Sequence, residues 1–146
     1  MPFDTLRRKY KRGEDMLNEK EILELIDEAI TAREGAYAKF SNFKVGAALI
    51  DDKGDHYTGC NVENSSYGLS MCGERNAIFH AVSKGMNKIK VIAVVGDTEG
   101  PISPCGACRQ VINEFATDET VVIMANIKKE YKIVKFTEIL PYGFRL

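Results

Sequence analysis

The amino-acid sequence predicts an α/β fold in three layers, α/β/α, with a mixed sheet of about five strands between helices. Segments with the composition of strands alternate along the chain with segments that have the apolar periodicity of helices. The chain has 146 residues, of which 45% are hydrophobic, a size that buries a core without disulfide bonds. No internal repeat or linker-like segment divides it. We therefore expect residues 1–146 to form a single domain.

The first predicted helix ends near Gly35. Its apolar side chains recur at intervals of three and four residues, which places them on one face: Ile22, Leu25, Ile26, Ala29 and Ile30. Two strands are expected next, over 43–50 and 56–64. The turn between them contains Gly54, a residue that tolerates a positive φ, so the two strands should form a hairpin.

Helices and strands alternate in the second half of the chain. A helix is predicted over 72–83, capped by Gly85, and its buried side should carry Ala77, Ile78, Ala81 and Val82. A buried strand follows at 90–96. Ser103 and Pro104 are residue types that begin helices, and the helix they start should bury Val111, Ile112 and Phe115. The last two strands are expected over 120–126 and 131–136.

Charge and hydropathy limit the classes of partner. The 20 Lys and Arg residues nearly balance the 21 Asp and Glu residues, so nothing favours a polyanion such as nucleic acid over a small ligand. A short basic run near the N-terminus is followed at once by acidic residues, and we expect residues 1–18 to form a solvated or subunit-covering arm. No apolar stretch suggests a signal peptide or a membrane span, so we expect a cytoplasmic location.

Three of the four cysteines are predicted to meet at the starts of two helices. Cys105 and Cys108 are three residues apart, so their sulfurs share a side, and Cys72 opens the preceding helix. Helix N-termini favour thiolates, which are the form that zinc binds. Three ligands with an open fourth position are typical of a catalytic zinc site. A closed structural site would need Cys60, which lies in a predicted strand.

Glu74 lies two residues after Cys72 and is the candidate catalytic residue. A glutamate in the first turn of a helix often belongs to a capping box, but that motif needs Ser or Thr at the position of Met71. A carboxylate beside an open zinc position can instead take a proton from water and deliver it elsewhere.

These motifs resemble the zinc-dependent cytidine deaminases, in the small three-cysteine form that assembles as homotetramers. The residues that carry the resemblance are "CGER" at 72–75 and "PCGAC" at 104–108. Three further segments agree in order and spacing, namely "YAKFSNFKVGAAL" at 37–49, "GCNVEN" at 59–64 and "LPYGF" at 140–144. The resemblance runs from about Ala36 to Phe144.

The resemblance implies hydrolysis of cytidine or 2′-deoxycytidine to the uridine product and ammonia, in pyrimidine salvage. One Zn²⁺ per subunit would be held by three thiolates, those of Cys72, Cys105 and Cys108. Glu74 would carry protons to ring N3 and then to the leaving amino group. Relatives use the residue that matches Arg75 to hydrogen-bond ligand sulfurs, although an arginine here could also be a plain surface charge.

Six further residues are implied as substrate contacts. Asn61 and Glu63 match the pair that binds the ribose 3′-hydroxyl, and they face the same way in an extended segment. Phe43 matches a residue near the ligand, with core packing as the alternative. Tyr67 matches a residue at a subunit boundary, and Phe144 matches an aromatic that reaches a neighbouring subunit's site. Gly73 departs from the family, in which alanine is usual at this position, and it adds a little room beside the base.

Two other functions stay open at this point. One is deamination of a modified cytosine nucleoside such as the antibiotic blasticidin S, whose enzymes share the zinc motif. The other is a non-catalytic, zinc-stabilised binding module. The segment "NVENSSY" at 61–67 favours plain nucleosides.

Overall fold

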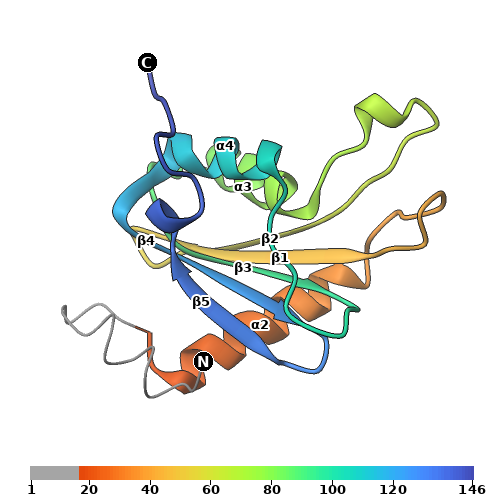
Figure 1. Cartoon of the computed structure of the whole chain (residues 1–146), viewed down its shortest axis with the longest axis horizontal. Coiled ribbons are helices and arrows are strands. Elements are labelled where there is room, and N and C mark those ends of the chain that lie inside the picture. The colour runs from red at the N-terminus through yellow and green to blue at the C-terminus, as the bar shows by residue number, and fades with distance from the viewer. Residues whose placement is uncertain (1–16) are drawn as a thin grey trace.

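The computed structural model describes residues 17–146, and within them the chain forms one five-stranded sheet (Figure 1). The strands are β1 (Val45–Asp51), β2 (His56–Cys60), β3 (Ile89–Gly96), β4 (Ala116–Asn126) and β5 (Tyr131–Lys135). They lie in the order β2-β1-β3-β4-β5. The β3–β4 pair is parallel and the other pairs are antiparallel, so the predicted mixed sheet is confirmed.

Helices cover both faces of the sheet and give the predicted three layers (Figure 1). Helix α2 (Glu19–Arg33) packs on one face. Helices α3 (Gly73–Ser83) and α4 (Gly106–Phe115) contact each other on the opposite face. Two short 3₁₀ turns, η1 (Tyr67–Leu69) and η2 (Phe136–Glu138), lie in the connections. None of the helices within residues 17–146 combines the length and apolar character needed to cross a membrane.

Helix α2 begins directly after the predicted N-terminal arm of residues 1–18. Asn18 caps the helix: its Oδ1 accepts from the Glu21 N–H at 2.9 Å, and a Glu21 carboxylate oxygen accepts from the Asn18 N–H at 3.3 Å. Leu17 packs against the core below the sheet. The rest of the predicted arm, residues 1–16, lies outside the described residues.

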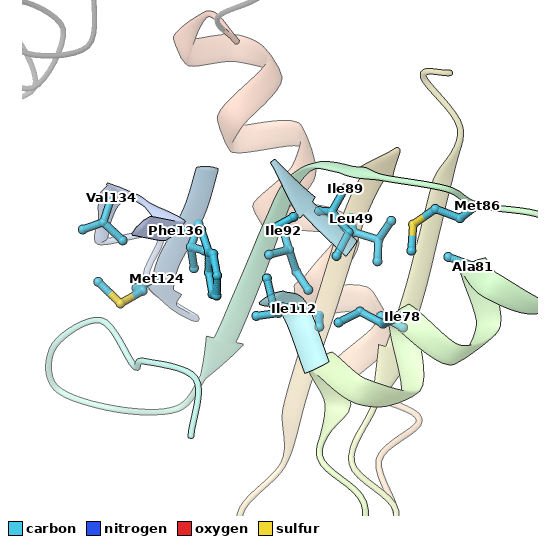
Figure 2. Packing of buried hydrophobic residues seen from close by; sticks show 14 residues of the cluster. Leu49, Ile78, Ala81, Met86, Ile89, Ile92, Ile112, Met124, Val134 and Phe136 are labelled. Atoms are coloured by element: carbon cyan, nitrogen blue, oxygen red, sulfur yellow. The ribbon is translucent and has the colours of Figure 1, made fainter. Parts of the chain in front are cut away.

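The core under α3 and α4 fixes these two helices on the sheet. Figure 2 shows Ile78 of α3 and Ile112 of α4 directed toward Leu49 of β1 and Ile92 of β3. All four side chains are almost completely buried. Burying an aliphatic side chain of this size contributes about 1.5–3 kcal/mol. The helix N-termini that carry the cysteines are therefore held by packing further along each helix.

Two glycines allow helices to approach the sheet closely. A Cβ at Gly59 of β2 would lie 2.3 Å from the backbone nitrogen of Ala77 in α3. A Cβ at Gly46 of β1 would lie 1.9 Å from the carbonyl oxygen of Ala29 in α2. Both distances are well inside van der Waals contact, so these positions need glycine for the layers to pack as they do.

Most predicted elements are present, and Gly54 and Gly85 both adopt the expected positive φ. Several details were wrong. The fourth strand begins at Ala116 rather than at 120, and Val111 and Phe115 of α4 are only partly buried. The second strand of the hairpin ends at Cys60 rather than continuing to 64. Val82 is 39% exposed, because α3 packs through a narrower stripe than its apolar residues suggest. Helix α4 begins at Gly106 and not at Pro104.

Candidate active site

The sulfur atoms of Cys72, Cys105 and Cys108 lie within 4.8 Å of one another, with 3.8 Å between those of Cys72 and Cys105. Four-coordinate zinc with Zn–S bonds of about 2.3 Å places its sulfurs about 3.8 Å apart. This is the only group of three potential metal ligands found within residues 17–146, and it does not include Cys60. The structure thus brings together the three cysteines that the sequence singled out.

Two of the three cysteines occupy the N-cap positions of helices. Cys72 is the N-cap residue of α3, and Cys105 is the N-cap residue of α4, where its sulfur accepts from the backbone N–H of Cys108 at 3.4 Å. This sulfur cap is why Ser103 does not begin the helix. The unpaired N–H groups and the positive end of each helix dipole favour negative charge at the sulfurs.

The thiols influence one another strongly. Hydrogen bonding with Cys108, followed by hydrogen bonding from Arg75, lowers the pKa of the Cys72 thiol to about 5 despite partial burial. The same interaction with Cys72, together with burial, raises the pKa of Cys108. Within this pair, the negative charge is therefore favoured on Cys72 and the proton on Cys108. A divalent cation between the sulfurs would displace that proton, because metal-bound cysteine is a thiolate.

Arg75 contacts the cluster and is not a plain surface charge. One of its terminal nitrogens donates to the sulfur of Cys72 at 3.3 Å. Its Nε is buried and has no hydrogen-bond partner among the described residues. A positive group with a spare buried donor beside three sulfurs fits a centre whose ligands together carry more negative charge than one Zn²⁺ neutralises.

Glu74 is a buried acid in the first turn of α3. The residue is 4% exposed, and burial, then the nearby Cys72 thiolate, raises the pKa of its carboxyl group. The cap of α3 contains no side-chain hydrogen bond, so Glu74 does not form a capping box. A buried carboxyl group with a raised pKa beside the three sulfurs is a candidate for accepting and releasing a proton.

Gly73, between Cys72 and Glu74, packs against the strand ends. A Cβ at Gly73 would lie 3.2 Å from the carbonyl oxygen of Val45 and 3.3 Å from the backbone nitrogen of Asn61. The first turn of α3 therefore touches the segment that carries the predicted sugar contacts. The predicted role of Gly73 beside the base stays a prediction.

The amide of Asn61 holds the start of β1. Its oxygen accepts from the N–H of Val45 at 2.8 Å, and its nitrogen donates to the carbonyl of Phe43 at 2.8 Å. The ring of Phe43 is 39% exposed and would lie 3.0 Å from a Cβ at Gly96. Phe43 therefore combines core packing with an accessible face, and it stands two residues before the strand on which it was expected.

Glu63 is held by the same loop. One of its carboxylate oxygens accepts from the N–H groups of Phe40 at 2.9 Å and Ser41 at 3.0 Å, and the other accepts from the Ser41 hydroxyl. The Ser41 hydrogen bonds lower the pKa of this carboxyl group. Glu63 also borders an open cavity of about 320 Å³, whose lining comprises Phe40, Ser41, Glu63, Tyr67 and Ser70. Sequence analysis missed Phe40, Ser41 and Ser70 here.

Tyr67 and Phe144 lie far from each other on exposed segments. Tyr67 is 75% exposed on η1 and packs edge-to-face on Phe40, with ring centroids 5.7 Å apart. Phe144 is 68% exposed near the C-terminus, where its carbonyl accepts from the Asn113 side chain of α4 at 3.0 Å. Figure 1 separates the η1 loop and the C-terminal end widely. One chain alone therefore does not bring Phe144 to the cavity beside Glu63.

The fold and this site together define a class, that of α/β/α enzymes with a metal centre of three cysteines at two adjacent helix N-termini. Comparison with known proteins makes the class specific. Residues 19–124 match the family model described as the cytidine and deoxycytidylate deaminase zinc-binding region. The chain belongs to this family of zinc-binding deaminases, which confirms the resemblance stated from its motifs.

Individual relatives cover most of the chain. A cytidine deaminase of Sporosarcina psychrophila is 48% identical over 85% of this chain and 91% of its own length. A crystal structure of cytidine deaminase from Burkholderia pseudomallei superposes with a TM-score of 0.81 at 45% identity, covering 88% of this chain and all of that one. The cytidine deaminase of Mycobacterium tuberculosis gives a TM-score of 0.74 at 35% identity, covering 85% and 97%.

Proposed function

We propose that the protein hydrolyses cytidine and 2′-deoxycytidine to uridine and 2′-deoxyuridine, with release of ammonia, in pyrimidine salvage. The observation that carries this proposal is the buried acid Glu74 beside the sulfurs of Cys72, Cys105 and Cys108. The names of the relatives support the cytosine nucleoside as substrate. The arrangement also favours catalysis over a purely structural role, because a closed zinc site needs a fourth protein ligand and Cys60 is not in the group.

Three cysteines would hold one Zn²⁺ per subunit, and the spacing of their sulfurs fits that ion. When bound, the ion would supply the Lewis acidity that makes water a nucleophile near neutral pH. Arg75 would offset part of the negative charge of the thiolates through its hydrogen bond to Cys72.

Glu74 would move the protons of the reaction. Its carboxylate takes a proton from the attacking water and delivers it to ring N3, which makes C4 more electrophilic and where the proton stays in the uridine product. The carboxylate then takes the second proton from the hydroxyl added at C4 and passes it to the amino group, which leaves as ammonia while the C4=O bond forms. Burial raises the pKa of this carboxyl group, so its acid form is more accessible than that of an exposed glutamate. One residue can then act as base and as acid within a single turnover.

The sugar would bind beside Glu63 and Asn61. Glu63 keeps a carboxylate at the edge of the cavity, where a ribose hydroxyl can donate to it. Among residues 17–146, no lysine or arginine belongs to the lining of that cavity, so the described lining offers a 5′-phosphate no cationic partner. Nucleosides are therefore the expected substrates, ahead of free cytosine and nucleotides.

The active species would be a homotetramer in the cytoplasm, with sites shared between subunits. Large apolar side chains are exposed on the two protruding loops and at the C-terminus, namely Tyr37, Phe40, Tyr67, Leu69 and Phe144. Exposed apolar surface of this extent is typical of protein interfaces. The distance of Phe144 from its own cavity supports a role in a neighbour's site.

Ammonia release from a panel of cytosine compounds tests the function. Purified protein with measured zinc content is assayed on cytidine, 2′-deoxycytidine, cytosine, cytidine 5′-monophosphate and blasticidin S. We expect turnover of the two nucleosides, and little or none of free cytosine and the nucleotide. Preference for blasticidin S would move the assignment to a modified nucleoside. No release from any compound, with one zinc bound per subunit, would favour a binding module.

A further inference from the structure

The hydroxyl group of Ser41 connects two segments that carry predicted substrate contacts. Its oxygen accepts from the backbone N–H of Phe43 at 3.0 Å, and its proton goes to a carboxylate oxygen of Glu63. A serine hydroxyl has one donor, so a direction is fixed: Phe43 N–H to Ser41 oxygen, and Ser41 O–H to Glu63. Such chains of hydrogen bonds strengthen one another.

The turn that makes this possible is local. Asn42, between Ser41 and Phe43, has a φ of 56°, in the left-handed region that asparagine tolerates better than most residues. The reversal brings the N–H of Phe43 back to the side chain of Ser41. The N–H of Asn42 bonds to the carbonyl of Ala38 at 2.9 Å, which closes the turn on its other side.

Phe43 is then held at both ends of its backbone. Ser41 accepts from its N–H, and the amide of Asn61 donates to its carbonyl. Glu63 in turn binds the N–H groups at the start of the same turn. Asn61, Glu63 and Phe43, the three predicted contacts nearest the sugar, therefore form one network, and Ser41 is the member that touches both Glu63 and Phe43.

The acceptor capacity of Glu63 shows what Ser41 does for a ligand. A carboxylate offers about four lone-pair positions. Three are occupied, by the N–H of Phe40 and by the N–H and hydroxyl of Ser41. The position that is left lies on the oxygen that Ser41 fixes, and Glu63 borders the open cavity. The lowered pKa of Glu63 agrees with this, because Ser41 is its largest cause.

We propose that Ser41 is a positioning residue that sets the Glu63 carboxylate to accept a single sugar hydroxyl and, through Phe43, fixes the loop beside it. The inference rests on the proposed function, since the hydroxyl in question is the ribose 3′-hydroxyl. It gives Ser41 a role that acts through Glu63, since the serine proton is already donated to that carboxylate. Its effect should therefore depend on whether the substrate carries that hydroxyl group.

The test compares cytidine with 3′-deoxycytidine for three variants. Ser41→Ala removes the donor to Glu63, Ser41→Thr keeps a hydroxyl, and Ser66→Ala is the matched control on the neighbouring segment. The Ser66 hydroxyl makes no capping bond in the structure. Ser41 is exposed, so alanine leaves no core cavity there. Zinc content and thermal melting confirm that each variant is folded and loaded.

For Ser41→Ala we expect KM for cytidine to rise about tenfold while kcat changes less than about threefold, as for loss of one hydrogen bond to a charged group. The preference of the wild type for cytidine over 3′-deoxycytidine should shrink by the same factor. Ser41→Thr should keep most of that preference, and Ser66→Ala should match the wild type.

Three results would overturn the inference. The first is an equal loss on both substrates in Ser41→Ala, which would indicate a general structural role. The second is a Ser41→Thr variant that behaves like Ser41→Ala. The third is a wild-type enzyme that deaminates cytidine without preferring it to 3′-deoxycytidine, which would refute the sugar contact while leaving the deaminase intact. Failure of the wild type to deaminate cytidine at all would refute the proposed function together with the inference.

Discussion

The end of the molecule that carries the three clustered cysteines, called the metal end below, and the loops around Ser41 and Glu63 are held in place by different forces. Glu74 is buried at the start of α3, and Cys108 is buried at the start of α4. Both helices are fixed by apolar packing on the sheet. The loops around Ser41 and Glu63 are exposed or half-buried, and side-chain hydrogen bonds to backbone groups tie them together.

This difference predicts how substitutions in each region affect activity. The groups proposed to perform the chemistry lie on helices packed into the core, so replacing one should remove a function without moving its neighbours. The groups proposed to select the substrate lie in a network of polar contacts, each worth about 1 kcal/mol or a little more. Substitutions at the metal end should abolish turnover, whereas substitutions in the loops should lower it only partly.

The largest effect is expected from the metal ligands. Cys105→Ala should lose both the bound zinc and all measurable activity, because two thiolates and water hold zinc far more weakly than three thiolates. Cys60→Ser is the matched control and should retain both, since Cys60 is not part of the sulfur group. Metal analysis together with ammonia release checks the pair. Loss of zinc in Cys60→Ser would revive a closed four-cysteine site.

Glu74→Gln should separate metal binding from chemistry. The amide has nearly the same shape but does not transfer protons, so zinc and nucleoside binding should persist while turnover falls. Positioned proton transfer contributes roughly 10²–10⁴-fold, and here it acts in more than one step. Zinc stoichiometry, nucleoside affinity by calorimetry and kcat are the measurements. Retention of more than about a tenth of wild-type kcat would contradict the assignment.

The same contrast explains which features the sequence could predict. The helix and strand pattern was visible because apolar periodicity decides it, and the convergence of three cysteines followed from their positions at helix starts. The start of α4 was placed at Ser103–Pro104 because these are usual first residues, whereas the sulfur of Cys105 does the capping. Cysteine is not a standard cap, so propensity does not reveal it.

The loop network had no sequence signal. Ser41 and Glu63 are 22 residues apart, and their contact depends on how two irregular segments meet beyond the strand ends. Val82 was misplaced for a related reason: with Phe79 it gives α3 an apolar outer stripe, which periodicity alone does not distinguish from a core stripe. The exposed apolar side chains are where a single chain leaves surface for partners.

The C-terminal aromatic should show an intermediate effect. A ring stacked near a base is worth about 1–3 kcal/mol, so Phe144→Ala should lower kcat/KM roughly ten- to a hundredfold with zinc retained. The backbone bond from Asn113 to the Phe144 carbonyl survives the substitution, so the segment should stay on α4. Light scattering checks that the assembly persists.

Mixed assemblies then test whether Phe144 acts in a neighbour's site. Co-expressed Glu74→Gln and Phe144→Ala subunits should form some sites in which an intact Glu74 meets an intact Phe144 from the other chain. Such sites should restore part of the wild-type activity, above the average of the two parents. Activity equal to that average, or a fully active monomer, would show that each chain uses its own residues only.

The smallest effect is expected on the face of the sheet opposite the site. Asn18 caps α2 through a reciprocal pair of bonds with Glu21. Asn18→Ala should destabilise the protein by about 1 kcal/mol, lowering Tm by a few degrees, while Asn18→Ser should preserve the cap. Because Asn18 lies at the start of α2, on the face of the sheet opposite α3 and α4, kcat/KM on cytidine should stay within about twofold of wild type for both variants, a limit well below one ordinary hydrogen bond. A larger change in Asn18→Ala alone would mean that the two faces of the sheet are coupled, and that the stiffness of the metal end depends on α2 as well as on α3 and α4.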